Sequence, residues 1–345
     1  MKLFNAGHPE SIQKAVEVLR GGGLVAFPTE TVYGLGADAT NDKAVCRIFE
    51  AKKRPTFDPL IVHVASVEQA HALWRGVPGA AESLMRRFWP GPLTIVLPKS
   101  ANVSDLVTAG LETVAVRMPR HDTALALIRA LGRPIAAPSA NVFGHTSPTS
   151  AAHVLEDLGD TVDLILDGGP CSVGVESTVL KIERGTGVLL RPGGVSADEL
   201  QTVIPLERKP KTNGAKVESP GQLETHYAPW TRFVLLPKKF SEFSPEFEAM
   251  RKEWEQAKNV APRVGLLAYD EAAASPHLES VQTLSEKSDP VEAATNLFQA
   301  MRKLDKMHLD FILAEPVPAG GIGEAIMDRL RRASGGQIAG KGTLC

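Results

Sequence analysis

The sequence has few of the features that would place it in a specialised class of protein. It contains only three cysteines in 345 residues, Cys46, Cys171 and Cys345, and they are far apart. An odd, sparse set without metal-ligand spacing argues against a disulfide framework and is typical of a reducing compartment. The N-terminus lacks the basic-then-apolar pattern of a signal peptide, and no run is long enough to span a bilayer. We therefore expect a soluble, cytoplasmic protein without membrane contact.

Several catalytic signatures are also missing. The chain has no G-x-x-x-x-G-K-[ST] motif, no G-x-G-x-x-G that opens a helix, no defensible Ser-His-Asp order and no metal-ligand cluster. The formal net charge of -2 gives no global sign of nucleic-acid binding, although a local basic patch is compatible with it. Chemistry without a protein nucleophile or metal site indicates an enzyme that positions two substrates and stabilises charge.

The length and the 43% hydrophobic content allow two domains, each with its own core. We predict a first domain over residues 1–205, in which strands and helices alternate with Gly/Pro turns. Residues 206–230 are polar, charged and without periodicity, so they read as a linker. Residues 231–345 return to alternating strands and helices, which predicts a smaller α/β domain with a parallel sheet.

The stretch Phe27–Gly36 stands out within the first domain. A short apolar run, Leu24–Phe27, reads as a buried strand, and it is followed by proline, two threonines, a glutamate and two glycines. Hydroxyls, a carboxylate and glycine-permitted turns at a strand end suit the binding of a small polar molecule. The alternative is a strand followed by an ordinary glycine turn.

Other polar residues recur at strand ends and in Gly/Pro turns. Arg117 follows Val116 and precedes Met118, so it needs an anionic partner if its strand is buried. The Lys52–Arg54 pair has a second explanation as a solvated helix end favoured by the helix dipole. His63 could likewise be a hydrogen-bonded core residue. Taken together, these cations, hydroxyls and glycines indicate a pocket for phosphate and carboxylate groups.

A family resemblance is carried by motifs that occur in one order from about residue 10 to residue 200. They are Phe27–Gly36, Lys52-x-Arg54-Pro55, Pro59–Val64, Pro90–Thr94, Val116–Pro119, Pro138–Asn141, Ser147–Thr149, Asp167–Gly169, Gly174–Val179 and Arg191–Gly193. With these motifs the sequence resembles the threonylcarbamoyl-AMP synthase (YrdC-like) family. The segment Ser219–Pro229 is similar to the linker of the family's long, two-domain form. The resemblance implies a twisted mixed α/β sheet with a concave basic cavity, joined to a smaller Rossmann-like α/β domain.

The implied activity is that of a nucleotidyltransferase, an L-threonylcarbamoyladenylate synthase. Such an enzyme converts L-threonine, bicarbonate and ATP into threonylcarbamoyl-AMP and pyrophosphate, for the N6-threonylcarbamoyladenosine modification of tRNA. The implied partners are a downstream threonylcarbamoyl transferase and, as a further candidate, tRNA itself. Mg²⁺ is expected to arrive on the ATP phosphates, because the chain offers no dedicated carboxylate cage.

The resemblance also implies roles for individual residues. The residues matched to L-threonine are Thr31, His63, Arg117, Ala137 (through its backbone) and Ser177. The residues matched to ATP are Lys52, Arg54, Asp58, Thr113, Ser139, Asn141, Ser147, Arg191 and the linker residue Tyr227. Lys52, Arg54 and Arg117 carry the catalytic role of offsetting negative charge, and the linker would act as a lid that excludes water.

Two departures from the family pattern, and two alternatives, accompany this interpretation. Residues Gln222–Thr225 replace a Met-Lys-Tyr-Arg-like run, so a basic contact to the nucleotide is missing, and Phe143 stands where serine is common. One alternative is a non-catalytic RNA-binding module that uses the same basic cavity; the net charge and the lack of interleaved aromatics disfavour it. The other is the related carbamoyl transferase domain of hydrogenase maturation, which normally lies in a longer chain with zinc fingers, whereas no CxxC is present here.

Overall fold

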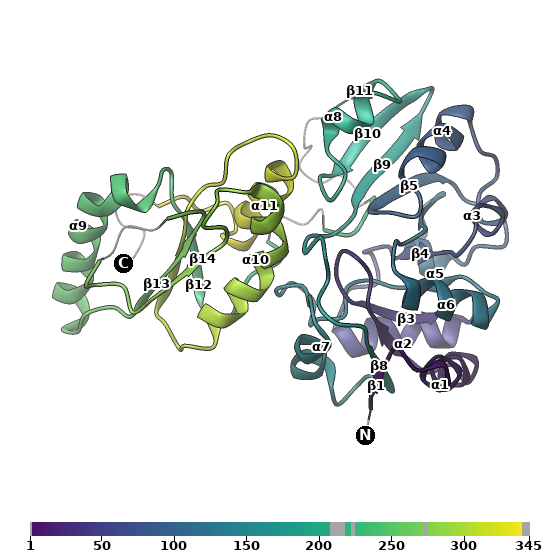
Figure 1. The fold of residues 1–345 in the computed structure, drawn as a ribbon, viewed down its shortest axis with the longest axis horizontal. Helices are drawn as coiled ribbons and strands as arrows, with labels where there is room; N and C mark the ends of the chain where they lie inside the picture. The colour runs from purple at the N-terminus through teal and green to yellow at the C-terminus, as the bar shows by residue number, and fades with distance from the viewer. Residues whose placement is uncertain (1, 208–217, 222–224, 272–274, 340–345) are drawn as a thin grey trace. The chain divides into compact units, whose positions relative to one another are not determined.

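The computed structural model describes residues 2–207, 218–221, 225–271 and 275–339 (Figure 1). The chain forms two compact units. Unit 1 comprises Met1–Phe143 and Ser147–Leu223, and unit 2 comprises Gly144–Thr146 and Glu224–Cys345. The segment 144–146 therefore packs with unit 2 although it lies within the sequence of unit 1. Within the described residues, no helix combines the length and apolar character needed to cross a membrane.

Unit 1 is built on a mixed sheet that has eleven strands in its described part. In spatial order they are β1 (Leu3–Asn5), β8 (Leu164–Asp167), β2 (Val25–Phe27), β3 (Gly34–Asp38), β7 (Ile135–Ala136), β4 (Ile61–His63), β6 (Thr113–Arg117), β5 (Leu93–Pro98), β9 (Thr178–Glu183), β10 (Thr186–Arg191) and β11 (Leu206–Glu207). Parallel and antiparallel pairs alternate irregularly along it, for example β4 with β6 parallel and β5 with β6 antiparallel. The mixed α/β fold class is thus confirmed.

Helices connect these strands. They are α1 (Pro9–Arg20), α2 (Asp42–Lys52), α3 (Val67–Leu73), α4 (Gly79–Phe88), α5 (Asp105–Thr108), α6 (Asp122–Leu131), α7 (Ala151–Leu158) and α8 (Ala197–Gln201). Their ends follow local chemistry: α1 has proline in its first turn, and α2 begins after Asn41, whose side chain accepts the backbone N–H of Lys43 at 3.1 Å. The helix α6 ends at Gly132, which has the positive φ of 73° that closes many helices.

The two faces of the sheet bury different sets of side chains. On β6, Val114 and Val116 belong to the main hydrophobic core of unit 1. Ala115 lies in a separate small cluster with Ile61, Val96 and Val179, all of them buried. Because side chains alternate along a strand, Thr113 and Arg117 lie on the same face as this second cluster. We call this face, with its four-residue apolar cluster, the site face.

The structure corrects the interpretation of Gly34 and Gly36 as turn residues. Both lie in β3, which pairs antiparallel with β2. A Cβ atom on Gly36 would lie 2.7 Å from the Phe27 ring and 2.8 Å from a methyl of Ile135, closer than packed atoms come. The glycine is therefore required by close packing within the sheet and not by a turn, and the turn is the segment 28–33 that precedes it.

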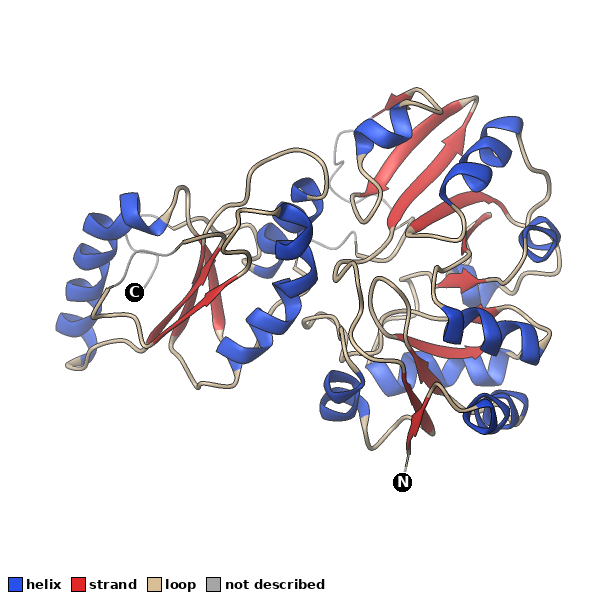
Figure 2. Ribbon diagram, in the orientation of Figure 1, coloured by secondary structure: helices blue, strands red, loops and turns tan. Residues whose placement is uncertain are grey.

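Unit 2 contains a second, smaller sheet of four strands in its described part, all parallel, in the order β12 (Arg232–Leu235), β15 (Phe311–Ala314), β13 (Val264–Ala268) and β14 (Ser280–Thr283). Figure 2 shows α9 (Phe240–Lys258) on one side of this sheet and α10 (Pro290–Asp305) and α11 (Gly323–Ala333) on the other. The predicted parallel α/β arrangement is confirmed, although β14, which has no fully buried residue, was not foreseen.

Candidate active site

The segment between β2 and β3 forms one wall of the site, and the Thr29 side chain fixes its shape. The Thr29 hydroxyl donates to the carbonyl of Val32 at 2.7 Å and accepts the backbone N–H of Thr31 at 3.2 Å. It also lies 2.9 Å from the Thr31 hydroxyl. These side chain–backbone bonds replace the strand ladder where the chain turns. The side chains of Glu30 and Thr31 are consequently held in fixed, buried positions.

Arg117 ends β6 on the site face and is 3% exposed. Its Nη1 donates to the Thr31 hydroxyl at 2.9 Å, and its Nε donates to the carbonyl of Gly91 at 3.2 Å. Its Nη2 lies 2.6 Å from a carboxylate oxygen of Glu30. The anionic partner that the buried arginine needs is therefore Glu30, a residue that was not among the predicted site residues. The only sequence signal for it is that Glu30 is the one carboxylate of Phe27–Gly36.

His63 lies opposite Arg117 in the pairing of β4 with β6. Burial, followed by repulsion from Arg117, lowers the pKa of His63 to about 3. Its ring meets the ring of Phe27 edge-on, with the centroids 6.0 Å apart. The imidazole is therefore neutral at physiological pH, so it can offer one donor and one acceptor but no charge.

Ser177 links the residues matched to threonine with those matched to the nucleotide. Its hydroxyl lies 2.8 Å from the hydroxyl of Thr94. The guanidinium of Arg191 donates to the Ser177 carbonyl at 2.9 Å and to its hydroxyl at 3.2 Å. A further N–H of Arg191 donates to the carbonyl of Pro220 at 3.1 Å, so part of the predicted linker contacts this cation within unit 1.

Lys52 joins the end of α2 to the segment Ser139–Asn141. Its ammonium donates to the Ser139 carbonyl at 2.6 Å, to the Asn141 carbonyl, and to the Asn141 side-chain oxygen at 3.3 Å. The Ser139 hydroxyl bonds the same side-chain oxygen at 2.6 Å. Burial, followed by repulsion from Arg54, lowers the pKa of Lys52 well below its usual range. The alternative of a solvated lysine is thus wrong, since this side chain is 1% exposed.

Arg54 is equally buried and forms an ion pair with Asp58 at 2.9 Å. It also donates to the backbone carbonyls of Asp58 and Pro59, at 3.2 and 2.9 Å. Its guanidinium lies 5.6 Å from the centre of the Phe143 ring, so the aromatic residue that departs from the family pattern contacts a predicted nucleotide residue. Burial raises the pKa of Asp58, although Arg54, Lys52 and Arg191 all act in the opposite direction.

The remaining predicted residues are spread around these groups. Ser147 donates to the carboxylate of Glu176, and both are buried. The backbone N–H of Ala137 donates to the carbonyl of Ile61 at 2.9 Å, which fixes the chain as it leaves β7. Thr113 lies at the start of β6, four residues before Arg117 on the same face. At strand spacing that is roughly 13 Å away, so it lies outside the Arg117 group.

Tyr227 belongs to unit 2 and is 1% exposed. Its ring packs on Phe298, with the centroids 5.9 Å apart, and the Arg329 guanidinium lies 4.8 Å from its centre. Its φ of 65° is unusual for a residue other than glycine. Residues 208–217 and 222–224 of the predicted lid lie outside the described residues, including most of the atypical Gln222–Thr225 run.

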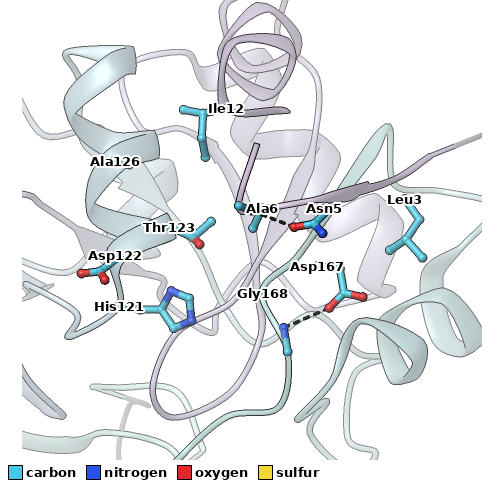
Figure 3. A pocket seen from close by; sticks show the side chains of 12 residues that line it. Leu3, Asn5, Ala6, Ile12, His121, Asp122, Thr123, Ala126, Asp167 and Gly168 are labelled. Carbon is cyan, nitrogen blue, oxygen red and sulfur yellow. Dashed lines mark hydrogen bonds between the residues drawn. The ribbon is translucent and has the colours of Figure 1, made fainter. Parts of the chain in front are cut away.

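A cavity of about 840 Å³ lies in unit 1 at the ends of β1 and β8. In Figure 3, His121 and Asp122 at the start of α6 lie on one side of it, and Asp167 and Gly168 on the other. None of the predicted site residues lines this cavity. Within the described part of the chain, no group of three or more His, Cys, Asp or Glu side chains could hold a metal ion.

Comparison with known proteins shows two family matches along the chain. Residues 17–193 match the Sua5/YciO/YrdC family model, described as telomere recombination, and residues 195–335 match the model described as the threonylcarbamoyl-AMP synthase C-terminal domain. The chain is 45% identical over 331 residues to the threonylcarbamoyl-AMP synthase of Pyrococcus abyssi, covering 95% of each protein. It is 46% identical over 332 residues to the protein of that name from Bacillus subtilis, covering 95% of this chain and 94% of the relative.

Solved structures show the same relationship. The crystal structure of P. abyssi Sua5 complexed with L-threonine matches with a TM-score of 0.86 and 44% identity, over 95% of both chains. A double alanine variant of P. abyssi Sua5 matches with a TM-score of 0.88 and 42% identity, over 98% of both chains. These matches span the sequence of both units.

Proposed function

Because this chain belongs to the threonylcarbamoyl-AMP synthase family, we propose that it converts L-threonine, bicarbonate and ATP into threonylcarbamoyl-AMP and pyrophosphate. The product would serve the N6-threonylcarbamoyladenosine modification of tRNA, through a downstream transferase. One observation supports this most directly: Ser177, matched to threonine, is hydrogen-bonded by Arg191, matched to ATP. Two binding sites that share such a contact can hold two substrates side by side.

The proposed chemistry is a nucleotidyl transfer. The threonine amine and bicarbonate condense to a carbamate and release water, one carbamate oxygen attacks the α-phosphorus of ATP, and pyrophosphate leaves. Two anions must approach one another, so the enzyme has to offset their repulsion. Lys52, Arg54 and Arg191 are buried side chains of unit 1, and the charge of each acts to lower the pKa of Asp58, so we treat them as one group. We assign this group to the ATP phosphates.

The amino-acid end of the site follows from Arg117. A planar guanidinium binds a carboxylate through two parallel N–H groups, which a lysine cannot reproduce. The neutral His63 beside it offers a hydrogen bond without competing for the carboxylate. The apolar cluster of Ile61, Val96, Ala115 and Val179 lies on the same face of the sheet as Arg117, and we assign the uncharged parts of the substrates to this face.

We expect ATP to arrive with Mg²⁺ on its phosphates, where the ion offsets part of their charge. No protein carboxylate needs to hold the ion in this proposal. Removal of Mg²⁺ with a chelator should therefore abolish activity without lowering the melting temperature of the ligand-free protein, because the metal enters with the substrate.

The function is tested by pyrophosphate release from ATP and Mg²⁺, with threonine and bicarbonate omitted in turn. Release that requires both supports the proposal, whereas release without either indicates a general ATPase. A folded sample that binds RNA but releases nothing would instead support the non-catalytic RNA-binding alternative.

The variant Arg117→Lys tests the threonine end of the site. It keeps a positive charge beside Glu30 but loses the planar guanidinium with its parallel N–H groups. We expect a fall of at least about 100-fold in kcat/KM for threonine, since about 3 kcal/mol of charge-assisted hydrogen bonding is lost. Arg133→Lys is the control, because Arg133 is half-exposed and pairs with Asp38 at the end of β3. An Arg117→Lys enzyme as active as this control would contradict the assignment of Arg117 to threonine.

A further inference from the structure

The carboxylate of Glu30 has hydrogen-bond acceptor positions that its ion pair with Arg117 does not use. The residue is 4% exposed, and its backbone carbonyl accepts the N–H of Val173 at 2.7 Å. Apart from the ion pair, neither carboxylate oxygen accepts a hydrogen bond within the described part of the chain. A carboxylate offers about four lone-pair positions, and a buried one is costly unless they are used. The Glu30 carboxylate is therefore a buried acceptor, held in place, whose lone pairs are largely unused within the described residues.

Arg117 is also only partly used. Its guanidinium has five N–H groups. One bonds Gly91, one bonds Thr31, and Nη2 faces Glu30. Within the described residues this leaves one N–H on each terminal nitrogen, which is the pair that a substrate carboxylate would need. The carboxylate of a bound amino acid would then share one guanidinium with the carboxylate of Glu30.

Two carboxylates on one guanidinium repel each other unless a second positive charge lies beside them. The other titratable side chains that act on Glu30 do not supply it. Burial lowers the pKa of His121, with Glu30 and Asp122 opposing the change, so the imidazole is neutral at pH 7. Burial raises the pKa of the Cys171 thiol to about 12, and Glu30 adds to the effect. Neither of these side chains supplies a positive charge, whereas an ammonium group on the ligand would.

An α-amino acid carries that positive charge on its ammonium nitrogen, which is bonded to the same Cα atom as the carboxylate. We propose that Glu30 binds the α-ammonium of threonine while Arg117 binds its carboxylate, so that the pair selects the zwitterion. This inference rests on the proposed function. It assigns to Glu30 the recognition of the amino group that the reaction converts to a carbamate, and thus makes Glu30 a specificity-determining residue for amino acids over hydroxy acids.

The test compares threonine with 3-hydroxybutanoate of the same configuration, which keeps the carboxylate, hydroxyl and methyl but lacks the amine. Binding of each is measured by calorimetry in the full chain. We expect wild-type protein to bind threonine at least about 10-fold more tightly than the hydroxy acid, from one charge-assisted hydrogen bond. Equal affinities in the wild type would overturn the proposal without any variant.

Glu30→Gln sharpens the comparison. We expect Glu30→Gln to lower the affinity for threonine by about 10- to 100-fold. The affinity for 3-hydroxybutanoate should stay unchanged or rise, because the repelling charge is gone. A change of both ligands by the same factor would mean that Glu30 serves only as a counter-ion of Arg117, and would refute the role. Asp38→Asn is the matched control, since it also removes a buried carboxylate paired with an arginine, and it should change neither affinity.

Glu30→Asp covers the case in which Glu30→Gln does not fold. This variant keeps the negative charge on a side chain that is one methylene shorter. The affinity for threonine should therefore fall, while the affinity for 3-hydroxybutanoate should not. Parallel loss of both ligands would again refute the proposal. Failure of the proposed function is distinguishable, because a wild-type protein that neither binds threonine nor releases pyrophosphate with it would fail before any comparison of ligands.

Discussion

Asp58 provides the sharpest test of whether Lys52, Arg54 and Arg191 form a phosphate-binding group. Its side chain is fully buried, and its carboxylate lies 2.9 Å from the Arg54 guanidinium. The change Asp58→Asn keeps the shape of the side chain and removes its negative charge from the three cations. In the absence of ligand the protein should therefore lose stability, and the loss should come from electrostatics and not from a cavity.

The magnitude follows from the burial of both partners. Removing one partner of a buried ion pair costs about 3–5 kcal/mol, and an asparagine oxygen can still accept from Arg54, which favours the lower value. For a unit the size of unit 1, about 3 kcal/mol corresponds to a fall of about 6–12 °C in melting temperature. Asp105→Asn is the control, because Asp105 is exposed where it pairs with Lys99 and should change little.

The diagnostic measurement is the shift in melting temperature that ATP and Mg²⁺ produce, followed by calorimetry. The triphosphate returns negative charge to the three cations. Although the resemblance matches Asp58 to ATP, its carboxylate pairs with Arg54, so in Asp58→Asn the triphosphate no longer meets a competing carboxylate. We therefore expect saturating ATP to raise the melting temperature of the variant by more than that of the wild type. An equal or smaller shift in the variant would refute the assignment of these cations to the phosphates.

Two further predictions concern the walls of the site. The pKa of His63 is lowered to about 3, so below pH 6.5 only the unfolded chain takes up its proton. The free energy of unfolding should then fall by up to about 1.4 kcal/mol per pH unit as the pH drops from 6.5 toward 3. Urea denaturation at pH 7, 6 and 5 should show a shallower dependence in His63→Gln, and parallel curves would contradict the neutral imidazole. Gly36→Ala should cost about 1–3 kcal/mol because its methyl would meet the Phe27 ring at 2.7 Å. Gly79→Ala, at the open start of α4, should be harmless in the same denaturation assay, and equal effects would refute the packing argument.

The sequence predicted helices best where their ends carry local signals. The bounds of Pro9–Arg20 and Asp122–Leu131 can be read from the sequence, because proline, glycine and a regular apolar period mark them. The strand Gly34–Asp38 was not predicted, since glycine is unfavourable in strands and more common in turns. What makes glycine necessary there is the Phe27 ring, which lies on a neighbouring strand and has no signature in the local sequence.

The site could be predicted by residue type but not by contact. The family motifs point to Lys52, Arg54 and Arg117, and all three are buried in the structure. Their partners are less accessible to sequence reasoning. Lys52 bonds the carbonyls of Ser139 and Asn141, and every residue has a carbonyl, so no pattern of side chains could identify them. Glu30 was visible as a carboxylate, but its pairing with Arg117 brings together a turn and a strand that are far apart in sequence. The neighbouring bond between Thr31 and Arg117 spans 86 residues.

These partners change how substrate binding should be understood. A buried cation is stable only if it has a counter-ion or hydrogen-bond acceptors, and Arg117, Arg54 and Lys52 each have such partners before a substrate arrives. A substrate anion therefore replaces or joins an existing contact of the cation. The binding free energy it gains is only the difference between the new contact and the existing one. For Arg117, a ligand with a carboxylate alone meets the repulsion of Glu30, while a zwitterion also satisfies the Glu30 carboxylate. Selectivity for an amino acid then arises from the arrangement that keeps the arginine stable in the folded protein, which is why a single substitution, Glu30→Gln, should separate the two ligands.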